Sequence, residues 1–66
     1  MREETVVVPN ERAEEFDTMA QTMFTNVDWE CESNDFNSTF TVWNVFTSEA
    51  ADAEVGAFVD AADYFQ

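Results

Sequence analysis

Hydrophobic and polar positions follow different periods along the chain, and the first stretch indicates a strand. Residues 3–8 form a short run with β-branched side chains from Thr5 to Val8, and Pro9 ends it. β-Branched side chains pack well on a pleated surface, whereas proline lacks the N–H that a central strand needs. We therefore predict a first strand over residues 3–8.

After Pro9 the apolar residues recur at spacings of three and four, which is the period of an α-helix. Asn10 is a residue type that caps helix N-termini, and the acidic residues that follow it suit the positive end of the helix dipole. We predict a helix from Glu11 to about Thr25 with one buried face. That face consists of Ala13, Phe16, Met19, Ala20, Met23 and Phe24.

From Val27 the period changes to two, which predicts a strand with one buried and one solvated face. Val27, Trp29 and Cys31 fall on the apolar side, and the acidic residues between them fall on the other side. A cluster of turn-forming residues at 33–38 precedes a β-branched and aromatic run at 39–46. Together these patterns predict a β-hairpin.

A hairpin turn centred near Asp35 determines which residues face one another across the two strands. On the inner face, Trp29 then lies opposite Val42. In the same way Cys31 lies opposite Phe40. The pairs on the outer, acidic face are Asp28 with Trp43, Glu30 with Thr41 and Glu32 with Thr39.

The last segment again has the period of a helix. Thr47 or Ser48 is expected to cap a helix that has Glu49 in its first turn and ends near Tyr64. Gly56, the single glycine of the chain, lies inside this helix at a cost of roughly 1 kcal/mol relative to alanine. It indicates a close approach, a kink or simply a loose place in the helix. The face that should dock on the sheet consists of Ala51, Val55, Phe58, Ala62 and Phe65.

A second face of this helix is acidic. At about 100° per residue, four carboxylates fall within an arc of about 80° around Gly56. The chain has only Arg2 and Arg12 to neutralise these charges, and both are distant in sequence. We call this set the acidic ridge, and it consists of Glu49, Asp52, Asp60 and Asp63.

The order of these elements predicts the fold class. A single α+β domain over residues 1–66, with the order β-α-β-β-α, places two helices on one face of a three-stranded, mainly antiparallel sheet. Short connections put the third strand in the middle of the sheet. The opposite face of the sheet is expected to be solvated and acidic.

Composition changes this picture mainly through charge. Fifteen Asp and Glu residues, against two Arg and no Lys or His, give a formal net charge of -13. Such a charge opposes folding, but 45% of the residues are hydrophobic and seven are Phe, so a packed core is expected. No apolar run is long enough for a membrane span, and the pattern of a signal peptide is absent. We expect a soluble, cytoplasmic protein.

The residue types exclude several chemistries. Without His or Lys there is no usual base to activate a Ser or Cys nucleophile. A conventional zinc site lacks its ligands, and no Asp-x-Asp-x-Asp-Gly calcium loop occurs. The single cysteine, Cys31, falls on the inward side of its strand with Val27 and Trp29 and is expected to be a small buried hydrophobe. We therefore expect a protein that is not an enzyme and that uses no cofactor or metal.

Two explanations of the charge are open at this point. One is a basic partner, such as a protein surface that normally holds the phosphates of DNA or RNA. The other is a halophile-adapted acidic protein, or an interaction adaptor without mimicry, whose carboxylates keep its surface hydrated. The absence of Lys with abundant Asp, Glu, Ala, Val and Thr favours the second, and seven Phe with two Trp favour the first. Neither explanation includes direct binding to nucleic acid, because the chain repels phosphate.

The partner hypothesis selects residues from two acidic surfaces. Trp43 stands out because an aromatic side chain on an open sheet face, among acids, can anchor a protein interface or receive an arginine. The alternative for Trp43 is packing under an edge of the sheet, or a shifted register. The candidate contact residues are Glu49, Asp52, Asp60 and Asp63 of the ridge, Asp28, Glu30 and Glu32 of the strand, and Trp43.

In its size, charge and richness in acidic and aromatic residues, the chain resembles the small inhibitors of phages and mobile elements that mimic DNA, including anti-CRISPR and anti-restriction proteins. The resemblance covers the whole chain and rests on composition, without a diagnostic motif. It implies an inhibitor whose carboxylates occupy the Lys- and Arg-lined channel of a nucleic-acid enzyme. For a CRISPR effector subunit, the implied contacts are the positions that read the short duplex motif or hold the DNA backbone. A phage-encoded inhibitor of this kind acts in the cytoplasm of the host cell.

Overall fold

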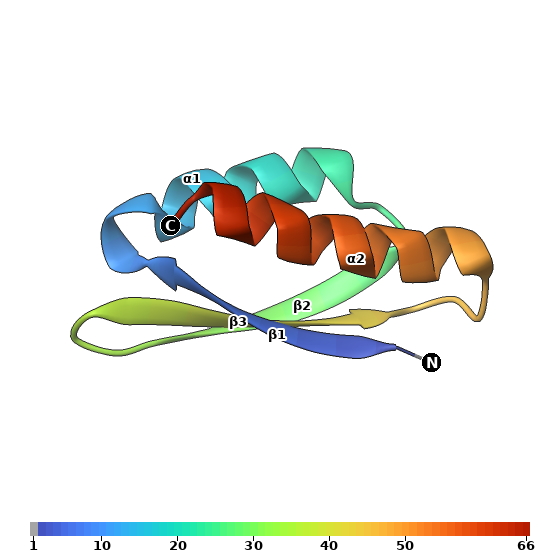
Figure 1. The fold of residues 1–66 in the computed structure, drawn as a ribbon, viewed down its shortest axis with the longest axis horizontal. Helices are drawn as coiled ribbons and strands as arrows, with labels where there is room; N and C mark the ends of the chain where they lie inside the picture. The colour runs from blue at the N-terminus through green and yellow to red at the C-terminus, as the bar shows by residue number, and fades with distance from the viewer. Residues whose placement is uncertain (1) are drawn as a thin grey trace.

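The computed structural model describes residues 2–66, which form a three-stranded sheet and a layer of two helices (Figure 1). Both helices cover the same face of the sheet, and within residues 2–66 no element covers the other face. The predicted α+β fold with the order β-α-β-β-α is therefore confirmed. The elements are β1 (Glu3–Pro9), α1 (Asn10–Met23), β2 (Val27–Ser33), β3 (Asn37–Asn44) and α2 (Glu49–Tyr64).

The third strand lies in the middle of the sheet, as predicted. β3 pairs with β1 on one side and with β2 on the other, and both pairs are antiparallel. The predicted hairpin register is confirmed, because Trp29 pairs with Val42 and Asp28 pairs with Trp43. A slip by one residue would have exchanged the two faces of β2, so this register decides which side chains reach solvent.

Asn34 organises the turn that sets this register. Its side-chain Oδ1 accepts hydrogen bonds from the backbone N–H groups of Phe36 at 2.9 Å and Asn37 at 2.8 Å. The backbone N–H of Asn34 donates to the carbonyl oxygen of Asn37 at 2.9 Å. Asparagine favours turns because its side chain can bind the backbone that follows it.

The prediction that Asn10 caps α1 is wrong. Pro9 occupies the N-cap position, and no side chain caps this end of the helix. Asn10 is instead the first helical residue, and its amide binds the hairpin: Nδ2 donates to the carbonyl oxygen of Asn34 at 2.7 Å, and Oδ1 accepts from the hydroxyl of Ser38 at 2.8 Å. These tertiary partners replace the local cap and tie the corner between β1 and α1 to the hairpin.

The apolar faces of the two helices are buried to different extents. In α2 the predicted face is confirmed, and Ser48 caps the helix by accepting the backbone N–H of Ala51 at 3.2 Å. In α1 the helix ends at Met23, which is 59% exposed although the pattern placed it on the buried face. Met23 follows Ala20 by three residues, so it is rotated about 60° away from the buried Ala20. The buried side chains of the helical layer are Phe16, Ala20, Phe24, Ala51, Val55, Phe58, Ala62 and Phe65.

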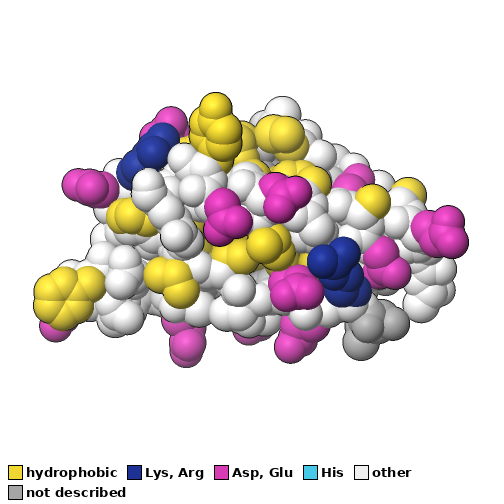
Figure 2. Space-filling model, in the orientation of Figure 1, with side chains coloured by type: hydrophobic (Ala, Val, Ile, Leu, Met, Phe, Trp, Pro, Cys, Tyr) yellow, Lys and Arg dark blue, Asp and Glu magenta, His cyan; other side chains and the backbone are white. Residues whose placement is uncertain are grey.

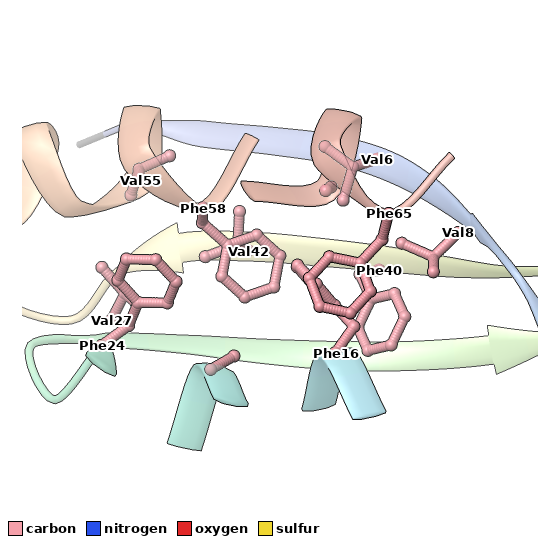
Figure 3. Packing of buried hydrophobic residues seen from close by; sticks show 12 residues of the cluster. Val6, Val8, Phe16, Phe24, Val27, Phe40, Val42, Val55, Phe58 and Phe65 are labelled. Carbon is pink, nitrogen blue, oxygen red and sulfur yellow. The ribbon is translucent and has the colours of Figure 1, made fainter. Parts of the chain in front are cut away.

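Aromatic rings fill the space between the helices and the sheet (Figure 3). Phe58 of α2 is fully buried at their centre, with its ring centroid 5.0 Å from Phe16, 5.5 Å from Phe24, 5.4 Å from Trp29 and 6.2 Å from Phe40. Edge-to-face aromatic pairs contribute about 0.5–1.5 kcal/mol beyond the area that they bury. The rings thus supply the buried apolar volume that Leu and Ile supply in other small cores.

Cys31 is exposed, which corrects the prediction of a buried thiol. Its side chain is on the helical side of β2, opposite the buried Phe40, as the register requires. However, β2 is an edge strand, and above it α1 presents the small Ala13 beside the polar Glu14 and Asp17. These side chains leave an open hollow, so an inward direction on the strand does not bury the sulfur.

Arg2 makes the close approach that Gly56 indicated. A Cβ atom on Gly56 would lie 3.2 Å from the NH1 atom of Arg2. The same nitrogen donates a hydrogen bond to the carbonyl oxygen of Asp52 at 3.2 Å. α2 continues through the glycine as one helix from Glu49 to Tyr64, so the glycine marks a contact and does not interrupt the helix.

Replacement of Gly56 by alanine is expected to raise the free energy of unfolding by about 0.5–1 kcal/mol, because alanine favours a helix interior. The new methyl group meets the end of the flexible Arg2 side chain, which is 44% exposed, so a small shift of that side chain relieves the contact. Urea denaturation followed by circular dichroism measures the change. The matched control is the same substitution in an Arg2→Ala background. A lower urea midpoint for Gly56→Ala in the wild-type background alone would show that the Arg2 contact outweighs helix propensity.

Candidate protein-interaction surfaces

The open face of the sheet carries a row of carboxylates beside a central row of Thr and Trp. The outward side chains of β2 are all acidic and exposed, and those of the central strand β3 are half-buried. On the far side of β3, the side chains of β1 complete the same cross-strand rows. We call this surface the acidic sheet face, and it consists of Glu3, Thr5, Val7, Thr39, Thr41, Trp43, Asp28, Glu30 and Glu32.

Trp43 lies on the acidic sheet face, and the alternative placement under an edge does not occur. Its cross-strand neighbours are Glu3 on β1 and Asp28 on β2, so one carboxylate stands on each side of the half-buried indole. Side chains directly opposite one another have Cβ atoms about 4.5–5.5 Å apart. Glu3 was not among the candidate residues, because its position beside Trp43 depends on the β1–β3 register, which the hairpin pattern does not contain.

The acidic ridge exists, but its members differ in environment. Glu49, Asp60 and Asp63 are exposed. Asp52 is half-buried, and its Oδ1 accepts a hydrogen bond at 2.7 Å from the side-chain amide of Asn44. Asn44 is only 4% exposed, so the Asp52 carboxylate supports the end of β3 as well as contributing charge to the ridge. Asp52 therefore does not point freely to solvent, although it belongs to the acidic ridge.

Arg2 also changes the ridge. Its distance in sequence suggested that it leaves the ridge uncompensated, but its guanidinium lies against Gly56 in the middle of the set. Arg2 additionally forms an exposed ion pair with Glu4, with Nε and Oε1 3.5 Å apart. One positive charge thus separates the N-terminal part of the ridge, Glu49 and Asp52, from its C-terminal part, Asp60 and Asp63.

The acidic ridge and the acidic sheet face lie on different sides of the molecule. Arg2, which precedes the edge strand β1, contacts the ridge, whereas the row of carboxylates belongs to β2 at the opposite edge. The two edge strands are about 10 Å apart, since neighbouring strands lie about 4.8 Å apart. On the face that Figure 2 shows, carboxylates are scattered over the helices and along the lower rim and do not gather in one patch. The structure therefore brings each predicted set together internally but does not merge the two sets.

Two other carboxylates hold the fold together. Asp17 of α1 accepts a hydrogen bond from the indole Nε1 of Trp29 at 2.8 Å and another from the side chain of Gln21 at 2.9 Å. Glu54 of α2 accepts both the backbone N–H of Asn26 at 3.0 Å and its side-chain Nδ2 at 2.9 Å. The sequence offered no signal for the contacts with Trp29 and Asn26, because each joins residues that are distant in the chain.

The described part of the chain contains no cluster of three or more His, Cys, Asp or Glu side chains placed to hold a metal ion. None of the helices within residues 2–66 has the length and apolar character required to cross a membrane. Neither a family model, nor a curated protein, nor a solved structure matches the chain. Its fold and surface define a small α+β protein with one open acidic sheet face and an acidic helix ridge.

Proposed function

We propose that this protein is an inhibitor that mimics the charge of nucleic acid and blocks the DNA-binding site of a nucleic-acid-processing complex, such as a CRISPR effector. The observation that carries the proposal is charge per unit length. Thirteen net negative charges lie on a body 35 Å long, which is one charge per about 2.7 Å against about 1.7 Å in duplex DNA. The body is about as long as one turn of B-DNA, roughly 34–36 Å.

Most of this charge is available to a partner. Within residues 2–66 two ion pairs occur, Arg2 with Glu4 at 3.5 Å and Arg12 with Glu15 at 3.8 Å. Both pairs are exposed and contribute little to stability, so a partner displaces them at small cost. The other carboxylates of residues 2–66 form no ion pair that a partner would have to displace. A basic surface gains attraction and faster association from such a protein.

The distribution of the carboxylates favours a channel over a flat patch as the binding site. The acidic ridge lies beside the β1 edge in the helical layer, and the carboxylates of β2 lie on the open sheet face at the other edge. A flat basic patch meets one of these surfaces. A channel that normally surrounds a nucleic-acid strand meets both, because its cationic side chains approach from more than one direction.

Competition with DNA tests the proposal. The immobilised protein captures candidates from a host lysate, and each captured nucleic-acid-binding protein is purified and titrated with the inhibitor while it holds a labelled duplex. We expect displacement of the duplex, with an inhibition that excess DNA reverses and that weakens as salt increases. A captured partner that still binds its DNA and works normally in an excess of this protein would contradict the proposal.

The second candidate function is that of a halophile-adapted acidic protein or an interaction adaptor with no mimicry. One observation favours it: the exposed carboxylates occur on α1, on α2 and on the open sheet face, as hydration of the whole surface requires. The two candidates differ in how the folded state depends on salt. Mimicry needs a protein that is folded at the ionic strength of an ordinary cytoplasm.

Added sodium chloride is expected to raise the melting temperature by about 5 °C or more between 0.1 and 1 M, because the Debye length falls from about 10 Å to about 3 Å and screens the self-repulsion. Both candidates share this result, and the state at 0.1 M distinguishes them. A folded protein there supports the inhibitor, and an unfolded one supports halophilic adaptation. Circular dichroism during a thermal scan measures both. Sulfate is avoided, since it also strengthens hydrophobic burial.

A further inference from the structure

We propose that the acidic sheet face reads arginine: a guanidinium group of the partner stacks on Trp43 between the carboxylates of Glu3 and Asp28. We call this position, formed by Trp43, Glu3 and Asp28, the seat. Its ligand rests on the proposed function, because the arginine comes from a protein surface that otherwise holds phosphates. The seat goes beyond that function, because charge mimicry by itself does not distinguish arginine from lysine. The seat predicts a preference for arginine over lysine.

The register supplies the geometry of the seat. Trp43 is on the central strand, and its direct partners in the sheet are Glu3 on one side and Asp28 on the other. The indole is half-buried between them, and both acidic residues are exposed. Asp28 uses Oδ1 to accept the backbone N–H of Trp29 at 3.0 Å. That bond orients the carboxylate and leaves its second oxygen for a ligand.

The open face gives a ligand access to this position. Both helices pack on the other side of the sheet, so no part of residues 2–66 covers the indole from the solvent side (Figure 1). The next cross-strand row consists of Thr5, Thr41 and Glu30. A peptide or loop that lies across the sheet can therefore place one cation on the ring and further polar groups on the hydroxyls and the carboxylate beside it.

The combination of an aromatic ring with two carboxylates fits a guanidinium better than an ammonium ion. Guanidinium is planar and weakly hydrated, so it stacks on an indole face while its edge N–H groups donate to carboxylate oxygens. An ammonium group is compact and strongly hydrated, and it gains mainly from charge. Tryptophan is also the aromatic residue that attracts cations most strongly.

Charge selects this occupant over the others that an open sheet face could take. A nucleic acid is repelled by the net charge of -13, and so is a second copy of this chain. A purely apolar segment would leave Glu3 and Asp28 without partners and partly removed from water, which is unfavourable for charged groups. A basic protein segment is complementary to both the ring and its flanks.

Two synthetic peptides of equal length and charge, one alternating Arg with Ser and one alternating Lys with Ser, test the seat. Titration calorimetry at physiological ionic strength gives the ratio of their dissociation constants. We expect the arginine peptide to bind wild-type protein about fivefold more tightly than the lysine peptide. In Trp43→Ala the ratio should fall to about one, because only the charge contribution remains, and Trp43→Phe should lie between.

Phe36→Ala is the matched control, because Phe36 is an aromatic residue at the hairpin tip that is 81% exposed and lies outside the seat. The arginine preference should survive in this variant. A second measurement needs no substitution at the seat: addition of the arginine peptide should shift the indole Nε1–H resonance of Trp43 in a nuclear magnetic resonance spectrum more than that of Trp29. Equal shifts, or a preference that Trp43→Ala leaves unchanged, would overturn the seat.

The outcomes separate this inference from the proposed function. If the protein displaces DNA from its partner and yet binds both peptides equally, the seat is wrong and charge mimicry stands. If the arginine preference depends on Trp43 but no partner loses its DNA, mimicry is wrong, and the face reads arginine on a surface of another kind. Stronger binding of a short DNA duplex than of the arginine peptide overturns the seat.

Discussion

Replacement of Phe58 by alanine is expected to leave the chain largely unfolded at low salt. Phe58 is fully buried, and its ring lies within about 6 Å of four other aromatic rings. Loss of a buried Phe costs about 3–5 kcal/mol through lost burial and the cavity left behind. At about 0.05–0.15 kcal/mol per residue, a chain of 66 residues has a total stability of roughly 3–10 kcal/mol. Self-repulsion of the carboxylates places this chain toward the lower end.

Urea denaturation at 0.1 and 1 M sodium chloride measures this effect, with circular dichroism as the signal. Phe36→Ala is the matched control, because the same substitution at an 81% exposed ring should change the free energy of unfolding by less than about 0.5 kcal/mol. High salt should partly restore the fold of Phe58→Ala by screening the acidic surface. A cooperative transition at the wild-type midpoint would show that the aromatic cluster does not carry the stability of the core.

Reversal of Asp60 and Asp63 to lysine is expected to slow association with the basic partner by about tenfold or more at low salt and to flatten the salt dependence of binding. Both carboxylates are exposed, form the C-terminal part of the acidic ridge, and make no hydrogen bond or ion pair within residues 2–66 through their side chains. Stopped-flow or surface-binding kinetics with the partner identified by competition measures the rates. Asp52 is unsuitable for this test, because its reversal would break the bond to the buried Asn44.

The matched control reverses Glu11 and Glu14 on α1, which are also exposed and change the net charge by the same amount. Asp17 is left intact because it accepts the indole N–H of Trp29. If the ridge contacts the partner, the association rate of the ridge variant should fall much further than that of the control. Equal losses in the two variants would mean that total charge, and not the ridge, governs association.

The periods of the sequence predicted the elements and their faces well because burial acts locally on each element. Alternation around Trp29 placed every outward side chain of β2 correctly, and the helical period around Phe58 placed the buried face of α2. The hairpin register also followed from local chemistry, since Asn34 binds the turn backbone within three residues of itself. Each of these features depends on neighbours in the chain, so the sequence contains the information.

Predictions failed where a residue found partners far away in the chain. Asn10 is a residue type that caps helices, but its side-chain amide instead forms hydrogen bonds with Asn34 and Ser38 of the hairpin. Cys31 faces the helices, but the residues that α1 places above an edge strand determine its exposure. In both cases the element that packs beside the residue determined the outcome, and the local preference of the residue did not.

The sequence by itself determined the net charge, the order and type of the elements, and the identity of the two acidic sets, because composition and periodicity are properties of local stretches. Only the tertiary structure decided how those sets are used. In the folded chain Asp52 accepts a hydrogen bond from Asn44, and Arg2 contacts a helix residue 50 positions away in sequence. Glu3 lies beside Trp43, and the ridge and the β2 carboxylates lie on different sides of the molecule. These outcomes depend on packing between distant elements, where the position of one side chain follows from the placement of all the others.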